Sequence, residues 1–260
     1  MNKIIYILII SLTICVFSQE VKNDEIKNNE VKNVIMLIPD GTSIGGITLA
    51  RWYKIEKIKQ ALIKENKTDE EIREAIAKEG KLALDEIVAG LVRVYCSDSA
   101  ITDSAPAATA FATGFKSQSK FIGVLPKKVS MPGLKPVDKL KPVATVLEAA
   151  KLSGKSTGLI ATSHIQHATP AGFSSHTPRR DDYETIGEQQ VYNGIDVVLG
   201  GGYHFLQKRE DKENLAKDLV SMGYEYFTDP KTMMESTSDK IWGMFAPEAL
   251  RYDFDRNPEN

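Results

Sequence analysis

The chain has 260 residues, of which 42% are hydrophobic and 26% charged, and its formal net charge is -2. This composition is typical of a globular protein and excludes collagen-like, mucin-like and wholly disordered chains. Without a basic excess, nucleic acid is not expected as a specific partner, and two cysteines cannot form a disulfide framework.

The N-terminus has the pattern of an export signal. Residues 1–18 are predicted to be a signal peptide, because Lys3 precedes an almost continuous apolar run that ends in a short cleavage site. An uncleaved anchor is the alternative, although the run is shorter than the roughly 20 apolar residues of a membrane span. A polar leader over 19–32 and a folded domain over 33–260 are expected to follow. We therefore expect an exported protein, either periplasmic, extracellular or held at the membrane by this segment.

The first part of the domain is predicted to be a strand followed by helices. Residues 34–38 are continuously apolar, as in a strand buried on both faces, and a turn follows at 39–41. A helix is expected from about Ile44 into the 50s. Residues 54–79 are rich in Lys and Glu, with apolar residues at helical spacing, and predict a solvent-exposed helical hairpin.

The middle of the chain continues the alternation of strands and helices. Residues 91–95 predict a strand, and residues 104–113 predict an Ala-rich helix that Gly114 ends. Residues 125–142 carry Pro, Gly and Lys and are interpreted as a surface loop. An amphipathic helix is expected over 143–152.

The last part predicts three more strands and one more helix. The strands are expected at 157–161, 195–199 and 224–227, and the helix at about 210–222. Three glycines at 200–202 lack the spacing of a nucleotide-binding turn and are interpreted as a structural turn. The order of elements predicts an α/β fold with a mostly parallel sheet and helices on both faces.

The first segment with chemical potential is Asp40-Gly41, at the carboxyl end of the first predicted strand. Ligands of α/β proteins gather at this end of the strands, and a carboxylate there suits a divalent cation. A turn or helix-cap aspartate is the alternative interpretation.

The second segment places Ser104 at the start of the Ala-rich helix. A helix N-terminus offers free N–H donors to an anion such as phosphate. The serine hydroxyl could act as a nucleophile if a base or a metal activates it. An ordinary helix-capping serine is the alternative, and the small side chains could simply permit tight helix packing.

The third segment is His164-Ile-Gln-His167-Ala-Thr169-Pro, which follows another predicted strand. Arg179 and Arg180 come soon after, and arginine is the side chain best suited to bind a phosphoryl group in a bidentate manner. Either histidine could instead be an ordinary hydrogen-bonded loop residue.

Together these segments resemble the alkaline phosphatase family. The matching stretches are V-I-M-L-I-P-D-G at 34–41, T-D-S-A-P-A-A-T-A-F-A-T-G at 102–114, H-A-T-P at 167–170 and D-V-V-L-G-G-G at 196–202. The D-S-A-x-x-A-T-A core is specific to this family. The resemblance implies a three-layer α/β/α fold that is usually homodimeric, with two zinc ions and one magnesium ion. It also implies hydrolysis of small phosphate monoesters through a phosphoserine.

The resemblance also implies roles for individual residues. Ser104 would be the nucleophile and a zinc ligand, and Asp40 would bridge a zinc and the magnesium. Thr169 and His167 would belong to the magnesium site, His167 standing where some members have Asp and others His. Arg180, with Arg179 as its rival, would bind the phosphate, and Asp103 would hold this arginine through an ion pair.

One feature departs from the family pattern. Family members extend well past this length and take their remaining metal ligands from the C-terminal half. The histidines here all precede residue 205. We therefore expect a truncated form of the fold whose activity as an isolated chain is open. The alternatives are a non-catalytic remnant that binds phosphate or metal, and a related phosphodiesterase.

Overall fold

The computed structural model describes residues 31–135 and 138–256, and the chain divides into two compact units, Met1–Pro39 and Asp40–Asn260. The predicted signal peptide and most of the predicted leader lie outside the described residues. In the first unit, residues 31–39 are extended and belong to no helix or strand. Everything below concerns the second unit unless stated.

Two predicted strands are wrong. Residues 34–38 and 91–95 are both irregular, and their apolar side chains are largely exposed, with Val34 at 83% and Leu91 at 86%. An apolar run becomes a strand only when a neighbouring strand accepts its backbone hydrogen bonds. Neither segment has such a neighbour among the described residues.

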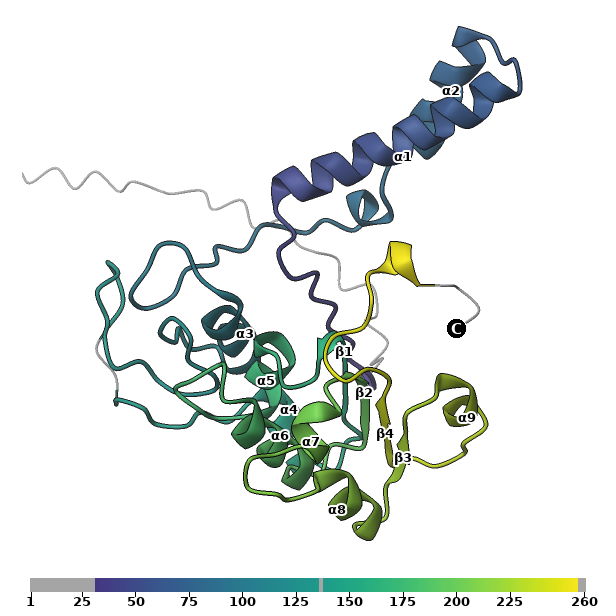
Figure 1. Ribbon diagram of the computed structural model, residues 1–260. Coiled ribbons are helices and arrows are strands. Elements are labelled where there is room, and N and C mark those ends of the chain that lie inside the picture. Colours follow the sequence, from purple (N-terminus) through teal and green to yellow (C-terminus); the bar gives the residue numbers. More distant parts are fainter. Residues whose placement is uncertain (1–30, 136–137, 257–260) are drawn as a thin grey trace, which may run out of the picture. The chain divides into compact units, whose positions relative to one another are not determined.

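The sheet has four parallel strands among the described residues (Figure 1). Their bounds are β1 Gly158–His164, β2 Val197–Gly201, β3 Glu225–Phe227 and β4 Ile241–Met244, in the order β1-β2-β4-β3. The first three confirm the predicted strands near 157–161, 195–199 and 224–227. The fourth was not predicted. The parallel sheet with its helices confirms the predicted α/β class.

One row of side chains across the sheet forms the centre of the core. Leu159, Val198, Trp242 and Tyr226 are paired in register from β1 to β3. They pack with apolar residues from α6, α7 and α8 in one cluster. Ile160, the next residue of β1, points away from this cluster and is 72% exposed, in keeping with the alternation of side chains along a strand.

The helices follow the predictions closely in the first half of the chain. They are α1 Ile44–Lys64, α2 Asp69–Glu79, α3 Ser104–Thr113, α4 Val146–Leu152, α5 Ala168–Ser174, α6 Tyr183–Tyr192, α7 His204–Gln207, α8 Leu215–Ser221 and α9 Pro230–Met234, with short 3-10 turns at Ala83–Glu86 and Asp253–Asp255. The pair α1 and α2 confirms the predicted hairpin. No helix of the described residues is long and apolar enough to cross a membrane.

Helix α3 confirms its predicted bounds. Gly114 ends it in the left-handed conformation, with φ at 77°. Helices α3 and α5 pack closely, because Gly172 of α5 has no side chain where a Cβ would lie 2.7 Å from the Cβ of Ala108. The small side chains of the Ala-rich segment therefore do permit tight helix packing.

The predicted glycine turn at 200–202 is only partly right, because Gly200 and Gly201 belong to β2 and Gly202 follows it. The role of these glycines is structural, since a Cβ on Gly201 would lie only 1.7 Å from the backbone oxygen of Glu248, and Gly202 has φ at 102°. Cys96 is a fully buried free thiol.

Candidate active site

The N-terminus of α3 presents two polar side chains in succession. Asp103 is the N-cap, and its Oδ1 accepts the backbone N–H of Ala105 at 2.8 Å. Ser104 is the first residue of the helix and is only partly buried. Because Asp103 caps the helix, the hydroxyl of Ser104 is left free to make other contacts.

The carboxylate of Asp40 accepts hydrogen bonds from two hydroxyl groups. The Oγ of Ser104 donates to its Oδ1 at 3.1 Å, and the Oγ1 of Thr169 donates to its Oδ2 at 2.8 Å. Thr169 lies in the first turn of α5, which starts just after the carboxyl end of β1. No helix was predicted over these residues, so α5 is an element that the sequence analysis missed.

Arg180 connects Asp103 with His167. Its Nη1 donates to Oδ1 of Asp103 at 3.2 Å, and its Nη2 lies 3.1 Å from Nε2 of His167. A guanidinium can only donate, so Nε2 of His167 accepts and the ring is neutral in this arrangement. Burial, followed by the charge of Arg180, lowers the pKa of His167.

Asp103 is held from several sides. Besides the N–H of Ala105, it accepts the hydroxyl of Ser119 at 2.9 Å and the backbone N–H of Lys120 at 2.8 Å. Burial alone would raise the pKa of Asp103, but these donors and the charge of Arg180 together lower it. Asp103 therefore stays ionised and is a fixed counter-charge for Arg180.

The residues assigned roles by the sequence thus form one connected group. The contacts run from His167 through Arg180 to Asp103, and from its neighbour Ser104 through Asp40 to Thr169. Arg179 does not join the group. Its side chain is 69% exposed and lies 3.8 Å from Asp181.

Sequence reasoning missed two contributors to this group and singled out a third, His164, without giving it a role. Ser119 and Lys120 hold Asp103 from a loop that has no recognisable pattern. His164, at the end of β1, stacks edge-on against His167 at 5.0 Å between ring centroids. Burial is the main cause that lowers the pKa of His164 to about 4, so this ring is neutral as well. Its place after a predicted strand was the available signal.

The donor atoms fit part of a magnesium site but not a zinc site. A carboxylate and two hydroxyls are hard oxygen donors of the kind that Mg²⁺ prefers. Among residues 31–135 and 138–256, no group of three His, Cys, Asp or Glu side chains could hold a metal ion. Catalytic zinc sites normally use three protein ligands. The described residues therefore do not complete either zinc site implied by the resemblance.

Comparisons with known proteins match the chain to one family. The family model described as alkaline phosphatase matches residues 31–260. Alkaline phosphatase 3 of Bacillus subtilis (strain 168) is 34% identical over 235 residues, which cover 87% of this chain and 44% of the relative. The repressible alkaline phosphatase of Saccharomyces cerevisiae is 32% identical over 250 residues, covering 86% of this chain and 39% of the relative. The chain thus spans less than half the length of these relatives.

Solved structures give the same result. The alkaline phosphatase of Thermus thermophilus superposes with a TM-score of 0.61 at 28% identity, over 80% of this chain and 40% of that one. The alkaline phosphatase of the Antarctic bacterium TAB5 does so with a TM-score of 0.55 at 30% identity, over 62% of this chain and 44% of that one. Variants of that enzyme with one histidine changed to aspartate or glutamate have magnesium bound in a site called M3.

Proposed function

The chain belongs to the alkaline phosphatase family, and from this premise we propose that it takes part in hydrolysing phosphate monoesters through a phosphoserine on Ser104. The observation that carries the proposal is the pairing of a nucleophile with a phosphate clamp. Ser104 directly follows Asp103, and Asp103 holds the guanidinium of Arg180 at 3.2 Å. Any anion that contacts Arg180 is therefore brought close to the hydroxyl of Ser104.

The residues support the following sequence of events. Arg180 and the backbone N–H of Ser104 bind oxygens of the phosphoryl group, since Ala105 and Ala107 donate to Asp103 and Pro106 has no N–H. The Oγ of Ser104 then forms a bond to phosphorus as the bond to the leaving oxygen breaks, while its proton passes to Oδ1 of Asp40, its acceptor at 3.1 Å, and from there through solvent to the departing alcohol. Water then attacks the phosphoserine, which releases inorganic phosphate and restores the hydroxyl of Ser104. In such transfers, positioning and charge stabilisation provide most of the rate. Asp103 keeps Arg180 in register throughout, because its carboxylate is fixed by Ser119 and Lys120.

Metal chemistry enters the proposal only in part. A magnesium ion held by Asp40 and Thr169 would add positive charge beside Ser104 and the phosphoryl group. The family resemblance adds two zinc ions, but the described residues do not complete a zinc site. We therefore derive no step of the reaction from zinc.

The test is hydrolysis of a chromogenic phosphate monoester by the 260-residue chain with added zinc and magnesium. Ser104→Ala is the matched variant, because it removes one oxygen and leaves the Asp103 cap in place. We expect turnover that the variant lacks, and phosphate labelling of Ser104 under acid quench. Labelling of a different residue would contradict the assignment of the nucleophile.

Binding of inorganic phosphate separates the proposed function from its nearest alternative. Phosphate binding that depends on Arg180, with no turnover at any metal concentration, would favour a non-catalytic phosphate-binding remnant. Turnover of a phosphate diester in preference to the monoester would favour a phosphodiesterase. Absence of phosphate binding from a folded chain would contradict the proposed site altogether.

Two further proposals come from the sequence. We propose that residues 1–18 direct export, which N-terminal sequencing of the mature protein would test. We also propose that the protein forms a homodimer, which light scattering would test. A mature protein that keeps Met1, or a protein that is monomeric in solution, would contradict the respective proposal.

A further inference from the structure

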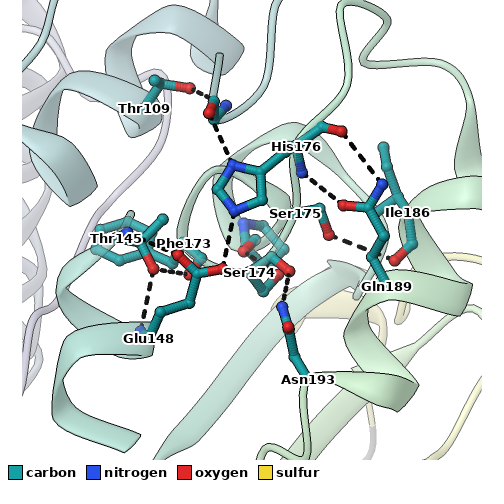
Figure 2. A network of polar contacts seen from close by, with 12 residues as sticks. Thr109, Thr145, Glu148, Phe173, Ser174, Ser175, His176, Ile186, Gln189 and Asn193 are labelled. Atoms are coloured by element: carbon teal, nitrogen blue, oxygen red, sulfur yellow. Dashed lines mark hydrogen bonds and ion pairs between the residues drawn. The ribbon is translucent and has the colours of Figure 1, made fainter. Parts of the chain in front are cut away.

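His176 lies between two acceptors that belong to distant parts of the chain (Figure 2). Its Nδ1 is 2.7 Å from the backbone oxygen of Gly123, and its Nε2 is 2.8 Å from Oε1 of Glu148. Gln189 of α6 holds the backbone of His176 on both sides, accepting its N–H at 2.6 Å and donating to its carbonyl at 3.2 Å. The ring is therefore fixed in place by α4, α6 and the loop at Gly123.

The geometry determines the charge of this ring. A carbonyl oxygen can only accept, so Nδ1 must carry a proton. Nε2 faces Glu148, whose other oxygen already accepts the backbone N–H of Thr145 at 2.7 Å in the capping box of α4. That bond favours the ionised carboxylate, so Nε2 is protonated as well and His176 is an imidazolium. The hydrogen bond to Glu148 is the first cause that raises the pKa of His176.

Gly123 is required for this contact. A Cβ at that position would lie 2.1 Å from the backbone oxygen of Ser175 and 2.6 Å from Nδ1 of His176. Gly123 also donates its N–H to Oγ1 of Thr109 at 3.0 Å, and Thr109 belongs to α3. The contact of His176 with Gly123 therefore reaches the helix that carries Ser104.

The segment after His176 leads directly to Arg180. Thr177 and Ile122 exchange both backbone hydrogen bonds, at 2.8 and 2.9 Å, and the N–H of Arg180 donates to the backbone oxygen of Lys120 at 2.9 Å. Lys120 in turn donates to Asp103. The segment 120–123 thus lies between His176 at one end and the pair of Arg180 and Asp103 at the other.

We propose that His176 is a positioning residue: as a cation bridging Gly123 and Glu148, it fixes the segment 120–123 and so holds Arg180 and Asp103 ready for phosphate. The role of Arg180 in this statement rests on the proposed function. Glu148 of α4 is the charged side chain that contacts the ring within the described residues. The other contacts come from uncharged groups, Gly123 of the loop and Gln189 of α6.

The charge of His176 can be tested without any activity. In the 260-residue chain labelled with 15N-histidine, we expect the His176 ring to keep both nitrogens protonated to a higher pH than the rings of His164 and His167. The signal of the His176 ring is expected to be absent in His176→Gln, and in Glu148→Gln the ring should lose its second proton at a lower pH than in the unchanged chain. A His176 ring in the unchanged chain that loses its second proton no later than those of His164 and His167 would overturn the proposal.

The positioning role is tested by the Nε–H signal of Arg180 and by the affinity for inorganic phosphate. In His176→Gln we expect that signal to broaden or shift, and phosphate to bind about tenfold more weakly. Asn193→Ala is the matched control. It removes another hydrogen bond of the same network, the one at 2.7 Å to the backbone oxygen of Ser174, without touching His176 or Gly123. We expect this variant to bind phosphate within twofold of the unchanged chain.

The outcomes separate the two proposals. If the unchanged chain binds no phosphate, the proposed function fails, and the Arg180 signal alone decides the positioning role. If His176→Gln leaves that signal unchanged, the positioning role is refuted even when phosphate binds. An equal loss of phosphate affinity in His176→Gln and Asn193→Ala would also refute it, because the effect would then come from general loosening of the network.

Discussion

Arg180 and Asp103 are 77 residues apart in the chain, and their side chains meet at 3.2 Å directly beside the start of α3. Both side chains are mostly buried, with 21% and 26% exposed. The guanidinium has a defined direction, because Nη1 contacts Asp103 while Nη2 lies 3.1 Å from Nε2 of His167. In the proposed function, this direction determines where an anion binds relative to Ser104.

The substitution Asp103→Asn tests the charge of this pair. Asparagine caps helices about as well as aspartate, so α3 should still form. Loss of the carboxylate should destabilise the fold by about 1.5–3 kcal/mol, the usual range for hydrogen bonds to charged groups. It should also weaken phosphate binding. Urea denaturation and phosphate titration measure the two effects, and an unchanged affinity would show that Arg180 needs no counter-charge.

The substitution Asp40→Asn tests the oxygen site. Mn²⁺ can replace Mg²⁺ as a paramagnetic probe, since both prefer oxygen ligands. We expect Asp40→Asn to reduce Mn²⁺ binding strongly and Thr169→Val to reduce it less, because a carboxylate contributes charge and a hydroxyl does not. Paramagnetic relaxation of water protons provides the measurement. Equal Mn²⁺ binding by Asp40→Asn and the unchanged chain would place the site elsewhere.

The substitution Gly123→Ala tests the close contact of Gly123 with Ser175 and His176. Gly123 and Gly154 have φ angles of 57° and 73°, but a Cβ at Gly154 would meet nothing within 4 Å. Alanine at 154 should cost about 1–2 kcal/mol for its backbone conformation alone. Alanine at 123 should cost about 1–3 kcal/mol more, because it also collides with Ser175. Chemical denaturation of both variants gives the difference, and equal losses would argue against the collision.

The substitution Arg209→Met tests a buried cation away from the site. Its side chain is 2% exposed and contacts the carboxylates of Asp211, Glu188 and Glu213. Removing the guanidinium should destabilise the fold by about 2–4 kcal/mol. The lower end is expected because the carboxylates are partly solvated. Arg179→Gln is the control, at a side chain 69% exposed, and should change stability by less than about 0.5 kcal/mol.

The pair of Glu148 and His176 predicts how stability changes with pH. Burial alone would raise the pKa of Glu148, but the hydrogen bonds from His176 and Thr145 lower it. The stability that Glu148 contributes is therefore present above the unfolded pKa of about 4.3 and is lost as pH falls through the folded pKa. The pKa of His176 is raised in the folded chain. The stability that this histidine contributes is therefore present below the unfolded pKa of about 6.5 and is lost as pH rises through the folded pKa. Stability from this pair should therefore be greatest between these two limits.

The variant Glu148→Gln provides the measurement for that prediction. Thermal unfolding of the unchanged chain and of the variant is compared from pH 3 to 9. The variant should lose the acid dependence of Glu148 and most of the alkaline dependence of His176. The two curves should therefore differ most near pH 5–6 and converge at both extremes. A constant difference across the range would show that the pair contributes no titrating interaction.

The fold was predictable where local signals and tertiary packing agree. Helix α3 was found with its bounds because an Ala-rich run and Gly114 indicate the same helix. Its N-cap is Asp103, and not Ser104, which the sequence offered as a capping serine. Helix α5 was missed because proline and glycine in its sequence A-T-P-A-G-F-S are poor helix formers. Its buried packing on α3 outweighs that tendency. Strand β4 has only four residues and includes Gly243, too short a pattern to detect.

The candidate site was predictable where a family motif marks it, and less so elsewhere. Asp40, Ser104 and Arg180 stand in recognisable motifs, and the structure places them in one group. His176 stands in no such pattern, and its role depends on Gly123 and Glu148, which only the folded chain brings near. Glu148 did have a local signal, the Thr145-x-x-Glu148 capping box. That signal predicts a helix start and says nothing of a histidine partner.

The close packing of α5 on α3 also bears on how such a sequence can diverge. Gly172 lies so near Ala108 that any larger side chain would push the two helices apart. Both helices carry a site residue in the first turn, Ser104 on one and Thr169 on the other, so wider spacing would separate their hydroxyls. Selection for activity should therefore keep small side chains at Ala108 and Gly172 in descendants of the gene. The hairpin of α1 and α2 has Ile72 as its buried apolar residue among the two helices, so fewer of its side chains are constrained by packing.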